Sequence, residues 1–255
     1  MDLTMNSLRL SDAIAAPRSI NVVDVDSSIV GFRSRDIRSR AFNLLRTQFV
    51  RLASEGAKII GITSATPRVG KTFVACNVAA SLARLPELST TLLDLDLRRG
   101  SVAERFNIPG ERGLSDYLEG KEEDLASLSW GVEKQRLTIF PTFNRDLQSA
   151  ELLSGQRFAD MMAAFRSLPD SIHICDLPPI FANDDAMIIE QQIDAYLLVV
   201  EDGITTAKQV RDALRLAGRS KFKGTILNRY IRGMSADAYG YGYGYGEDAY
   251  SKYYG

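Results

Sequence analysis

The segment that most constrains this chain is the loop Ser64-Ala65-Thr66-Pro67-Arg68-Val69-Gly70-Lys71-Thr72. An apolar run, 59–62, precedes it, and a run suited to a helix, 73–80, follows it. This order predicts a strand, a loop and a helix that begins at Gly-Lys-Thr. Backbone N–H groups at a helix N-terminus bind anions, and lysine and threonine add a cation and a Mg2+ ligand, so the loop predicts a nucleotide-phosphate site. The usual pattern G-x-x-x-x-G-K-[ST] lacks its first glycine here, because Ala65 stands in that position.

Acidic residues close two of the other predicted strands. The run 90–96 ends in Asp94 and Asp96 and continues into Arg98, and the run 171–176 ends in Asp176. Buried parallel strands are near-continuous apolar runs, and ligands bind at their carboxyl ends. Carboxylates placed there are poor core residues but good ligands for magnesium. We therefore expect these acids to meet the phosphate loop, with Asp176 as the acid that orders Mg2+.

Strand-like and helix-like runs alternate along the chain, which predicts an α/β fold with a mostly parallel central sheet flanked by helices in three layers. Strands are expected near 58–63, 90–96, 136–140, 171–176, 195–200 and 224–228, and helices at 36–52, 71–85, 150–168, from 184, and at 205–217. Residues 1–35 show no periodicity and are expected to form a loosely packed N-terminal arm. The predicted nucleotide-binding domain then spans 36–232, followed by a tail over 233–255.

Composition excludes several classes of function. Lys and Arg total 31 against 32 Asp and Glu, so the net charge of −1 provides no field to attract nucleic acid. The chain shows neither the start of a signal peptide nor a run of roughly 20 apolar residues, so we expect a cytoplasmic protein that meets the membrane through a partner. Cys76 and Cys175 are expected to be buried thiols, and the single histidine, His173, a structural strand residue. Zinc, redox and Ser-His-Asp chemistry are therefore not expected.

The C-terminal end differs in composition from the rest of the chain. Seven of the ten tyrosines lie in the last 17 residues, and residues 239–246 alternate tyrosine with glycine. Glycine at every second position costs backbone entropy and supplies nothing to bury, so a flexible tail is expected rather than a strand. The tyrosines of this tail are Tyr239, Tyr241, Tyr243, Tyr245, Tyr250, Tyr253 and Tyr254.

Together these motifs resemble the bacterial tyrosine autokinases that govern capsule and exopolysaccharide synthesis. The resemblance extends from about Asp36 to the C-terminus. It rests on the phosphate loop 64–72, the acidic strand ends 92–98 and 174–179, the tyrosine tail, and the shorter segments 113–118 and 150–154. That family tolerates the loss of the first loop glycine, so Ala65 is compatible with it.

The resemblance implies kinship with the partition and division-site ATPases, which usually carry a further lysine where this chain has Thr66. It also implies that Asn228 recognises the adenine base, and that ATP and Mg2+ are bound. Members tend to form rings through an E-x-x-R-x-x-R motif on the first helix; the aligned positions here are Arg40, Asn43 and Arg46, and only the last matches. Many members are activated by a transmembrane polysaccharide co-polymerase, so such a partner and self-association are expected.

These inferences assign a role to each residue of the site. Nucleotide contacts are expected from Thr66, Pro67, Arg68, Val69, Gly70, Lys71, Thr72, Arg98 and Asn228, metal contacts from Thr72, Asp94 and Asp176, and catalysis from Lys71, Asp94, Asp96 and Asp176. A free tyrosine has a pKa near 10, so its proton needs an acceptor, for which Asp94 and Asp96 are equal candidates. The expected reaction is autophosphorylation of the tail in trans. Two alternatives stay open: a partition-type ATPase, and a nucleotide-binding adaptor without catalysis.

Overall fold

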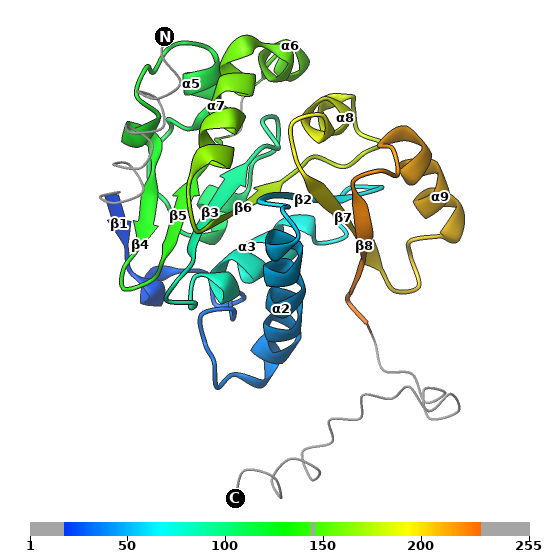
Figure 1. Cartoon of the computed structure of the whole chain (residues 1–255), viewed down its shortest axis with the longest axis horizontal. Helices are drawn as coiled ribbons and strands as arrows, with labels where there is room; N and C mark the ends of the chain where they lie inside the picture. Colours follow the sequence, from blue (N-terminus) through cyan, green and yellow to red (C-terminus); the bar gives the residue numbers. More distant parts are fainter. Residues whose placement is uncertain (1–17, 144–145, 231–255) are drawn as a thin grey trace, which may run out of the picture.

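The computed structural model describes residues 18–143 and 146–230 (Figure 1). Within these residues an eight-stranded sheet has the order β1-β4-β5-β3-β6-β2-β7-β8. The strands are β1 (Arg18–Ile20), β2 (Ile59–Ser64), β3 (Ser89–Asp94), β4 (Trp130–Val132), β5 (Leu137–Phe140), β6 (Ser171–Asp176), β7 (Ala195–Glu201) and β8 (Phe222–Asn228). Neighbouring strands are parallel except β4 and β5, which are antiparallel.

Helices cover both faces of the sheet, so the predicted three-layer α/β fold is confirmed. They are α2 (Arg40–Ser54), α3 (Lys71–Leu82), α4 (Val102–Arg105), α5 (Leu114–Leu118), α6 (Ser149–Ser154), α7 (Gln156–Ser167), α8 (Asp185–Glu190) and α9 (Ala207–Leu216), with 3-10 turns at Val22–Asp24, Ile37–Ser39 and Leu125–Leu128. One apolar cluster joins the sheet to α2, α3 and α4, and a second joins its other face to α5, α7, α8 and α9.

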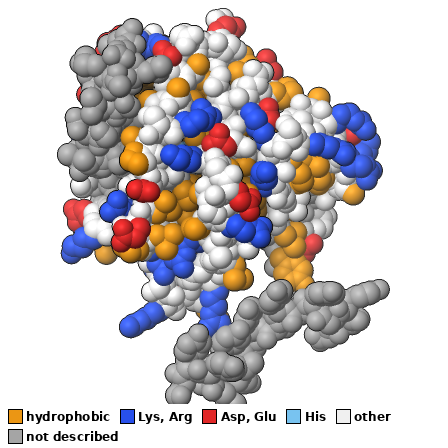
Figure 2. Space-filling view, viewed as in Figure 1, with side chains coloured by type: hydrophobic (Ala, Val, Ile, Leu, Met, Phe, Trp, Pro, Cys, Tyr) orange, Lys and Arg blue, Asp and Glu red, His pale blue; other side chains and the backbone are white. Residues whose placement is uncertain are grey.

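The centre of the sheet is buried on both faces, and its strands combine apolar residues with buried polar ones such as Thr63, Thr91 and His173. All six residues of β2 are buried. Helix α3 is also buried almost all round, since it lies between the sheet and α2. By contrast, α9 is amphipathic: Ala213 is buried, whereas Lys208 and Arg215 are exposed, and Lys and Arg side chains gather over α9 at the right-hand edge of Figure 2. The rigid centre of the sheet is the part that leads into the phosphate loop.

The six predicted strands are present, but two short strands were not expected. β1 and β4 have three residues each, too few to give an alternating pattern, and they form because they pair with each other and with β5. The predicted helix 150–168 is wrong as a single element. Gly155 has an extended backbone and separates α6 from α7.

The expectation of a loosely packed arm is wrong for residues 18–35. Val25, Ile29 and Val30 are buried in the core. The N–H groups of Val30 and Gly31 donate to Asn77 Oδ1 of α3 at 2.8 and 3.0 Å. A Cβ on Gly31 would lie 2.3 Å from the Asn77 carbonyl oxygen, so only glycine allows this close approach. The periodicity of apolar residues in the sequence does not reveal this segment, because its buried apolar residues lie in turns rather than in a long helix or strand.

The expectations for cysteine and histidine are confirmed. Cys76 and Cys175 are buried and free. His173 is fully buried with Nε2 3.0 Å from Ser171 Oγ, and burial lowers the pKa of His173 to about 3. Across residues 18–143 and 146–230, no helix combines the length and the apolar character needed to cross a membrane.

Candidate active site

The phosphate loop joins the carboxyl end of β2 to the first turn of α3. Gly70 has φ +92°, in the left-handed region, and a Cβ there would lie 2.2 Å from Asn228 Nδ2. Asn228, the last residue of β8, donates from that nitrogen to the Val69 carbonyl at 2.8 Å. The glycine is therefore required both by its backbone conformation and by the side chain that braces the loop.

The absence of the first loop glycine has a structural explanation. Ala65 is buried, its methyl group belongs to the core cluster beneath the loop, and its carbonyl accepts the Phe181 N–H at 3.1 Å. Its φ is not among the positive values in the described part of the chain. Since the backbone does not require glycine at this position, alanine fits the loop without strain.

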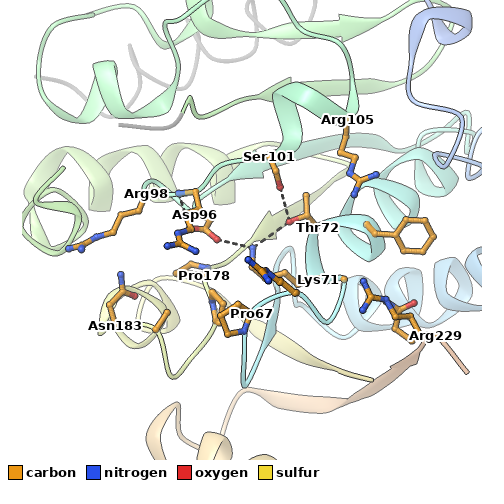
Figure 3. A pocket seen from close by; sticks show the side chains of 17 residues that line it. Pro67, Lys71, Thr72, Asp96, Arg98, Ser101, Arg105, Pro178, Asn183 and Arg229 are labelled. Carbon is orange, nitrogen blue, oxygen red and sulfur yellow. Dashed lines mark hydrogen bonds and ion pairs between the residues drawn. The ribbon is translucent and has the colours of Figure 1, made fainter. Parts of the chain in front are cut away.

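Lys71 lies at the centre of the site, between the carboxylates of Asp96 and Asp176; Figure 3 shows it beside Asp96. Its Nζ is 2.9 Å from Asp96 Oδ2 and 3.5 Å from Asp176 Oδ1, and 3.4 Å from Thr72 Oγ1. Burial opposes the charge of the ammonium, but the carboxylates of Asp176 and Asp96 outweigh burial and raise the pKa of Lys71 above its usual value. Lys71 is therefore a cation held by anions until a phosphate competes for it.

Asp94 and Asp176 are opposite each other on β3 and β6. Asp176 Oδ2 accepts the Thr72 hydroxyl at 2.6 Å, and Asp94 Oδ2 accepts the Val102 N–H at 3.0 Å. Burial raises the pKa of both carboxyl groups, and for Asp94 the charge of Asp176 adds to the effect. Two buried carboxylates on neighbouring strands need a cation to balance their charge. Lys71 is such a cation, but it also pairs with Asp96.

The residues fit a nucleotide-bound magnesium ion. Among the described residues no group of three or more His, Cys, Asp or Glu converges on one point. Mg2+ in nucleotide sites takes one or two carboxylates and completes its shell with phosphates and water, so such a group is not needed. Asp94 Oδ1 is buried and accepts no hydrogen bond within the described chain, which leaves it free for a cation or its water.

A pocket of ≈ 990 Å³ opens above these acids (Figure 3). Six cationic side chains line it: Arg68, Lys71, Arg98, Arg99, Arg105 and Arg229. Asp96 is the acidic residue in its wall, whereas Asp94 and Asp176 lie behind the wall, and Thr66 and Val69 contribute loop backbone rather than lining. An excess of guanidinium groups around one lysine suits a polyphosphate ligand.

The pocket also contains polar residues that sequence reasoning missed: Arg99, Ser101, Arg105, Asn183 and Arg229. Ser101 Oγ lies 3.3 Å from Thr72 Oγ1. Arg105 is positioned by the N-terminal segment, because its Nη1 donates to Ser28 Oγ at 3.2 Å. Ser101 follows the acidic strand end 90–96, and Asn183 follows the double proline at 178–179, so the sequence could have indicated both residues. No local pattern indicated Arg105.

Two expectations concern parts of the chain away from the pocket. The tail tyrosines lie outside the described residues. On α2, Asn43 Oδ1 accepts from Arg84 Nη1 at 2.9 Å and from Ser81 Oγ at 3.3 Å, and Arg46 Nη1 donates to the Ser81 carbonyl at 3.5 Å. These two positions of the first-helix motif therefore contact α3 and its C-terminal extension in the same subunit, and self-association stays a prediction.

Comparison with known proteins gives this site its context. No protein-family model matches the sequence. Tyrosine-protein kinase Etk of Escherichia coli K12 is 34% identical over 204 residues, which are 78% of this chain and 28% of Etk. Tyrosine-protein kinase CpsD of Streptococcus agalactiae serotype III is 33% identical over 191 residues, 74% of this chain and 81% of CpsD. The chain belongs to the bacterial tyrosine-protein kinase family. The chain spans 28% of the length of Etk.

Solved structures agree with this family assignment. The kinase domain of Escherichia coli Etk matches with a TM-score of 0.72 and 29% identity, over 83% of this chain and 85% of that one. The VpsO kinase domain matches with a TM-score of 0.67 and 29% identity, over 75% of this chain and 94% of that one. The septum site-determining protein MinD of Pyrococcus horikoshii, with Mg-ADP, matches at 0.56 with 22% identity over 69% of this chain and 72% of that one, which shows a shared fold.

Proposed function

We propose that this chain is an ATP-dependent protein-tyrosine kinase that phosphorylates its own C-terminal tyrosines in trans. The observation that carries the proposal is Lys71, held 2.9 Å from Asp96 and 3.5 Å from Asp176 at the floor of a pocket rich in arginine. The family relationship supports tyrosine as the acceptor in preference to water. The proposed cofactors are ATP, as phosphoryl donor, and Mg2+.

The loop and Lys71 would bind the phosphates. Gly70, Lys71 and Thr72 at the start of α3 line the pocket, where a helix N-terminus offers backbone N–H groups and the positive end of its dipole. Lys71 would exchange its contacts with Asp96 and Asp176 for phosphate oxygens. Because phosphoryl transfer depends mainly on positioning and charge neutralisation, this exchange is the main contribution of the loop.

Thr72, Asp94 and Asp176 are the proposed holders of Mg2+. The hydroxyl of Thr72 and the carboxylate of Asp176 are already 2.6 Å apart, and Asp94 faces Asp176 across the strand pair. The ion, when bound, would neutralise phosphate charge. Residues of the chain hold these ligands in position: Asp176 orients the Thr72 hydroxyl, and the Val102 N–H donates to the Asp94 carboxylate.

Asp96 is the better candidate for the acceptor of the tyrosine proton. It lines the pocket and is 6% exposed, whereas Asp94 is fully buried behind it. When phosphate draws Lys71 away, Asp96 loses its counter-ion in the place where an acceptor hydroxyl would arrive. A carboxylate in that position would hold the tyrosine proton as the hydroxyl oxygen attacks.

The proposed acceptors are the seven tail tyrosines from Tyr239 to Tyr254, and the proposed role is regulation of capsule or exopolysaccharide polymerisation and export. Asn228 is the proposed contact to adenine. We further propose self-association, activation by a membrane polysaccharide co-polymerase, and a location at the inner face of the cell membrane through that partner.

The deciding experiment incubates the purified chain with ATP and Mg2+ and maps phosphate by mass spectrometry, with and without the cytoplasmic segment of the activating partner. Lys71→Met and Asp96→Asn are the test variants. Lys58→Met is the matched control, because Lys58 Nζ donates to the Arg166 and Leu168 carbonyls at the other end of the sheet. Tail phosphotyrosine in wild type and Lys58→Met, absent from both test variants, supports the proposal. Free phosphate with an unmodified tail supports the partition-type ATPase, and neither product supports the adaptor.

A further inference from the structure

The buried carboxylate of Asp185 organises one end of the pocket. Asp185 begins α8 and is 1% exposed. Its Oδ2 accepts the Ser149 hydroxyl at 2.7 Å and the Asn183 amide at 2.7 Å. Ser149 Oγ in turn accepts Arg98 Nε at 2.7 Å, and that nitrogen lies 3.9 Å from Asp185 Oδ2. One buried acid thus holds two residues of the pocket wall, Arg98 and Asn183.

This arrangement leaves the outer part of Arg98 available to a ligand. Its Nε is used by Ser149, while no hydrogen bond to Nη1 or Nη2 occurs among the described residues. The side chain is 49% exposed and lines the pocket. A guanidinium anchored through Nε presents its two terminal nitrogens as a fork, which is the geometry that binds a carboxylate or phosphate with two hydrogen bonds.

The position of Arg98 separates it from the part of the pocket assigned to the base. In Figure 3, Arg98 and Asn183 lie on one side of Lys71, and Arg105 and Arg229 lie on the other. Asn228, next to Arg229 in the chain, is the proposed adenine contact. With the base at that end and the phosphates at Lys71, the far end beyond the terminal phosphate is where an in-line acceptor must enter.

We propose that Arg98 and Asn183 form an acceptor subsite that binds an acidic side chain next to the target tyrosine, and that Asp185 positions both residues. This inference rests on the proposed kinase function. The ligand class is an acidic tyrosine-containing peptide. The chain carries one such sequence in Glu247-Asp248-Ala249-Tyr250, where two carboxylates precede a tail tyrosine.

The test measures binding rather than turnover. A synthetic, fluorescently labelled peptide of residues 241–255 is titrated with the full-length chain in ADP and Mg2+, beside a peptide carrying Glu247→Gln and Asp248→Asn. The chain's own tail competes equally with both peptides, so the ratio of their Kd values is the readout. We expect the acidic peptide to bind about tenfold more tightly, the effect of one charge-assisted pair at a half-exposed arginine.

Substitutions in the chain then show which residues cause the difference in affinity between the two peptides. Arg98→Gln should bring the ratio close to one, and its Kd for ADP, measured beside the ratio, separates this role from the nucleotide contact expected of Arg98 from the sequence. Asp185→Asn should lower the ratio as well, and Asn183→Ala provides a second test if Asp185→Asn fails to fold. Arg215→Gln, on the outer face of α9, is the matched control and should keep the wild-type ratio. Thermal unfolding of each variant verifies that it is folded.

Equal affinity of wild type for the two peptides would overturn the inference. So would a ratio that survives Arg98→Gln, or a loss of ADP affinity in Arg98→Gln without a change in the ratio, which would place Arg98 in the nucleotide site. The outcome is separate from that of the kinase assay. Tyrosine phosphorylation without peptide discrimination defeats the subsite alone, and discrimination without phosphorylation defeats the kinase proposal and leaves a peptide-binding site.

Discussion

Replacement of Lys71 by methionine is expected to destabilise the protein strongly at alkaline pH. Lys71 is buried and lies within 3.5 Å of both Asp96 and Asp176, with Asp94 behind them. Removing one partner of a buried ion pair leaves an uncompensated charge and costs about 3–5 kcal/mol. For a chain of this size that cost corresponds to a fall of about 10 °C in the unfolding temperature.

The pH dependence gives this prediction its specificity. The raised pKa of Lys71 means that its stabilising charge is complete below its unfolded-state pKa of about 10.4, so it is fully present at both pH 5 and pH 8. Burial raises the pKa values of Asp94 and Asp176, and the charge of Lys71 opposes that rise, so without Lys71 the folded variant binds their protons more tightly than folded wild type does. Lowering the pH therefore stabilises the Lys71→Met variant relative to wild type. We expect its loss of stability to be at least about 1.4 kcal/mol smaller at pH 5 than at pH 8.

Urea unfolding followed by the fluorescence of the single tryptophan, buried Trp130, measures both values. Lys58→Met is the control, since Lys58 Nζ is held by carbonyl oxygens rather than by carboxylates, and its effect should be the same at both pH values. If Lys71→Met unfolds at the same urea concentration as wild type at pH 8, or if its deficit does not change with pH, the three carboxylates do not depend on Lys71 and the reasoning is wrong.

Three further predictions test other parts of the molecule. Gly70→Ala should weaken ADP binding about tenfold, because left-handed backbone costs alanine about 1–2 kcal/mol and its Cβ displaces Asn228. In urea unfolding without nucleotide, adding Asn228→Ala to Gly70→Ala should cost little further stability, and full additivity of the two changes would contradict the contact. Burial lowers the pKa of His173 to about 3, below the unfolded value near 6.5, so its contribution to stability is complete above pH 6.5 and is lost on acidification at up to about 1.4 kcal/mol per pH unit. Urea unfolding of His173→Gln between pH 6 and 4 should show a correspondingly shallower slope, and equal slopes would refute this. Seven phosphotyrosines would add roughly −10 to −14 to the chain, so successive tail tyrosine-to-phenylalanine changes should alter self-association, measured by sedimentation, by number; one substitution that abolishes the whole effect would contradict the charge-sum idea.

The strands around the site could be predicted because their signals are local. β2, β3 and β6 are short, mainly uncharged runs centred on Ile and Leu residues, and each one leads into the loop or ends in an acid. The parallel fold then brings those ends to one edge, so Lys71, Asp96 and Asp176 meet as expected. The three-residue strands β1 and β4 could not be predicted, because they form only through pairing with residues more than a hundred positions away or across a turn.

The phosphate loop, the acids at the strand ends and the α/β class were determined by sequence alone, because a strand–loop–helix order and apolar periodicity act over a few neighbouring residues. Tertiary structure decided the rest. It placed Asp96 in the pocket wall and Asp94 behind the wall, because the position of each carboxylate depends on how β3 packs and on what the residues at the end of β3 contact. It also joined Arg98, Ser149 and Asp185, which lie on three separate segments. Contacts between distant segments carry no local pattern, so only the folded chain reveals them.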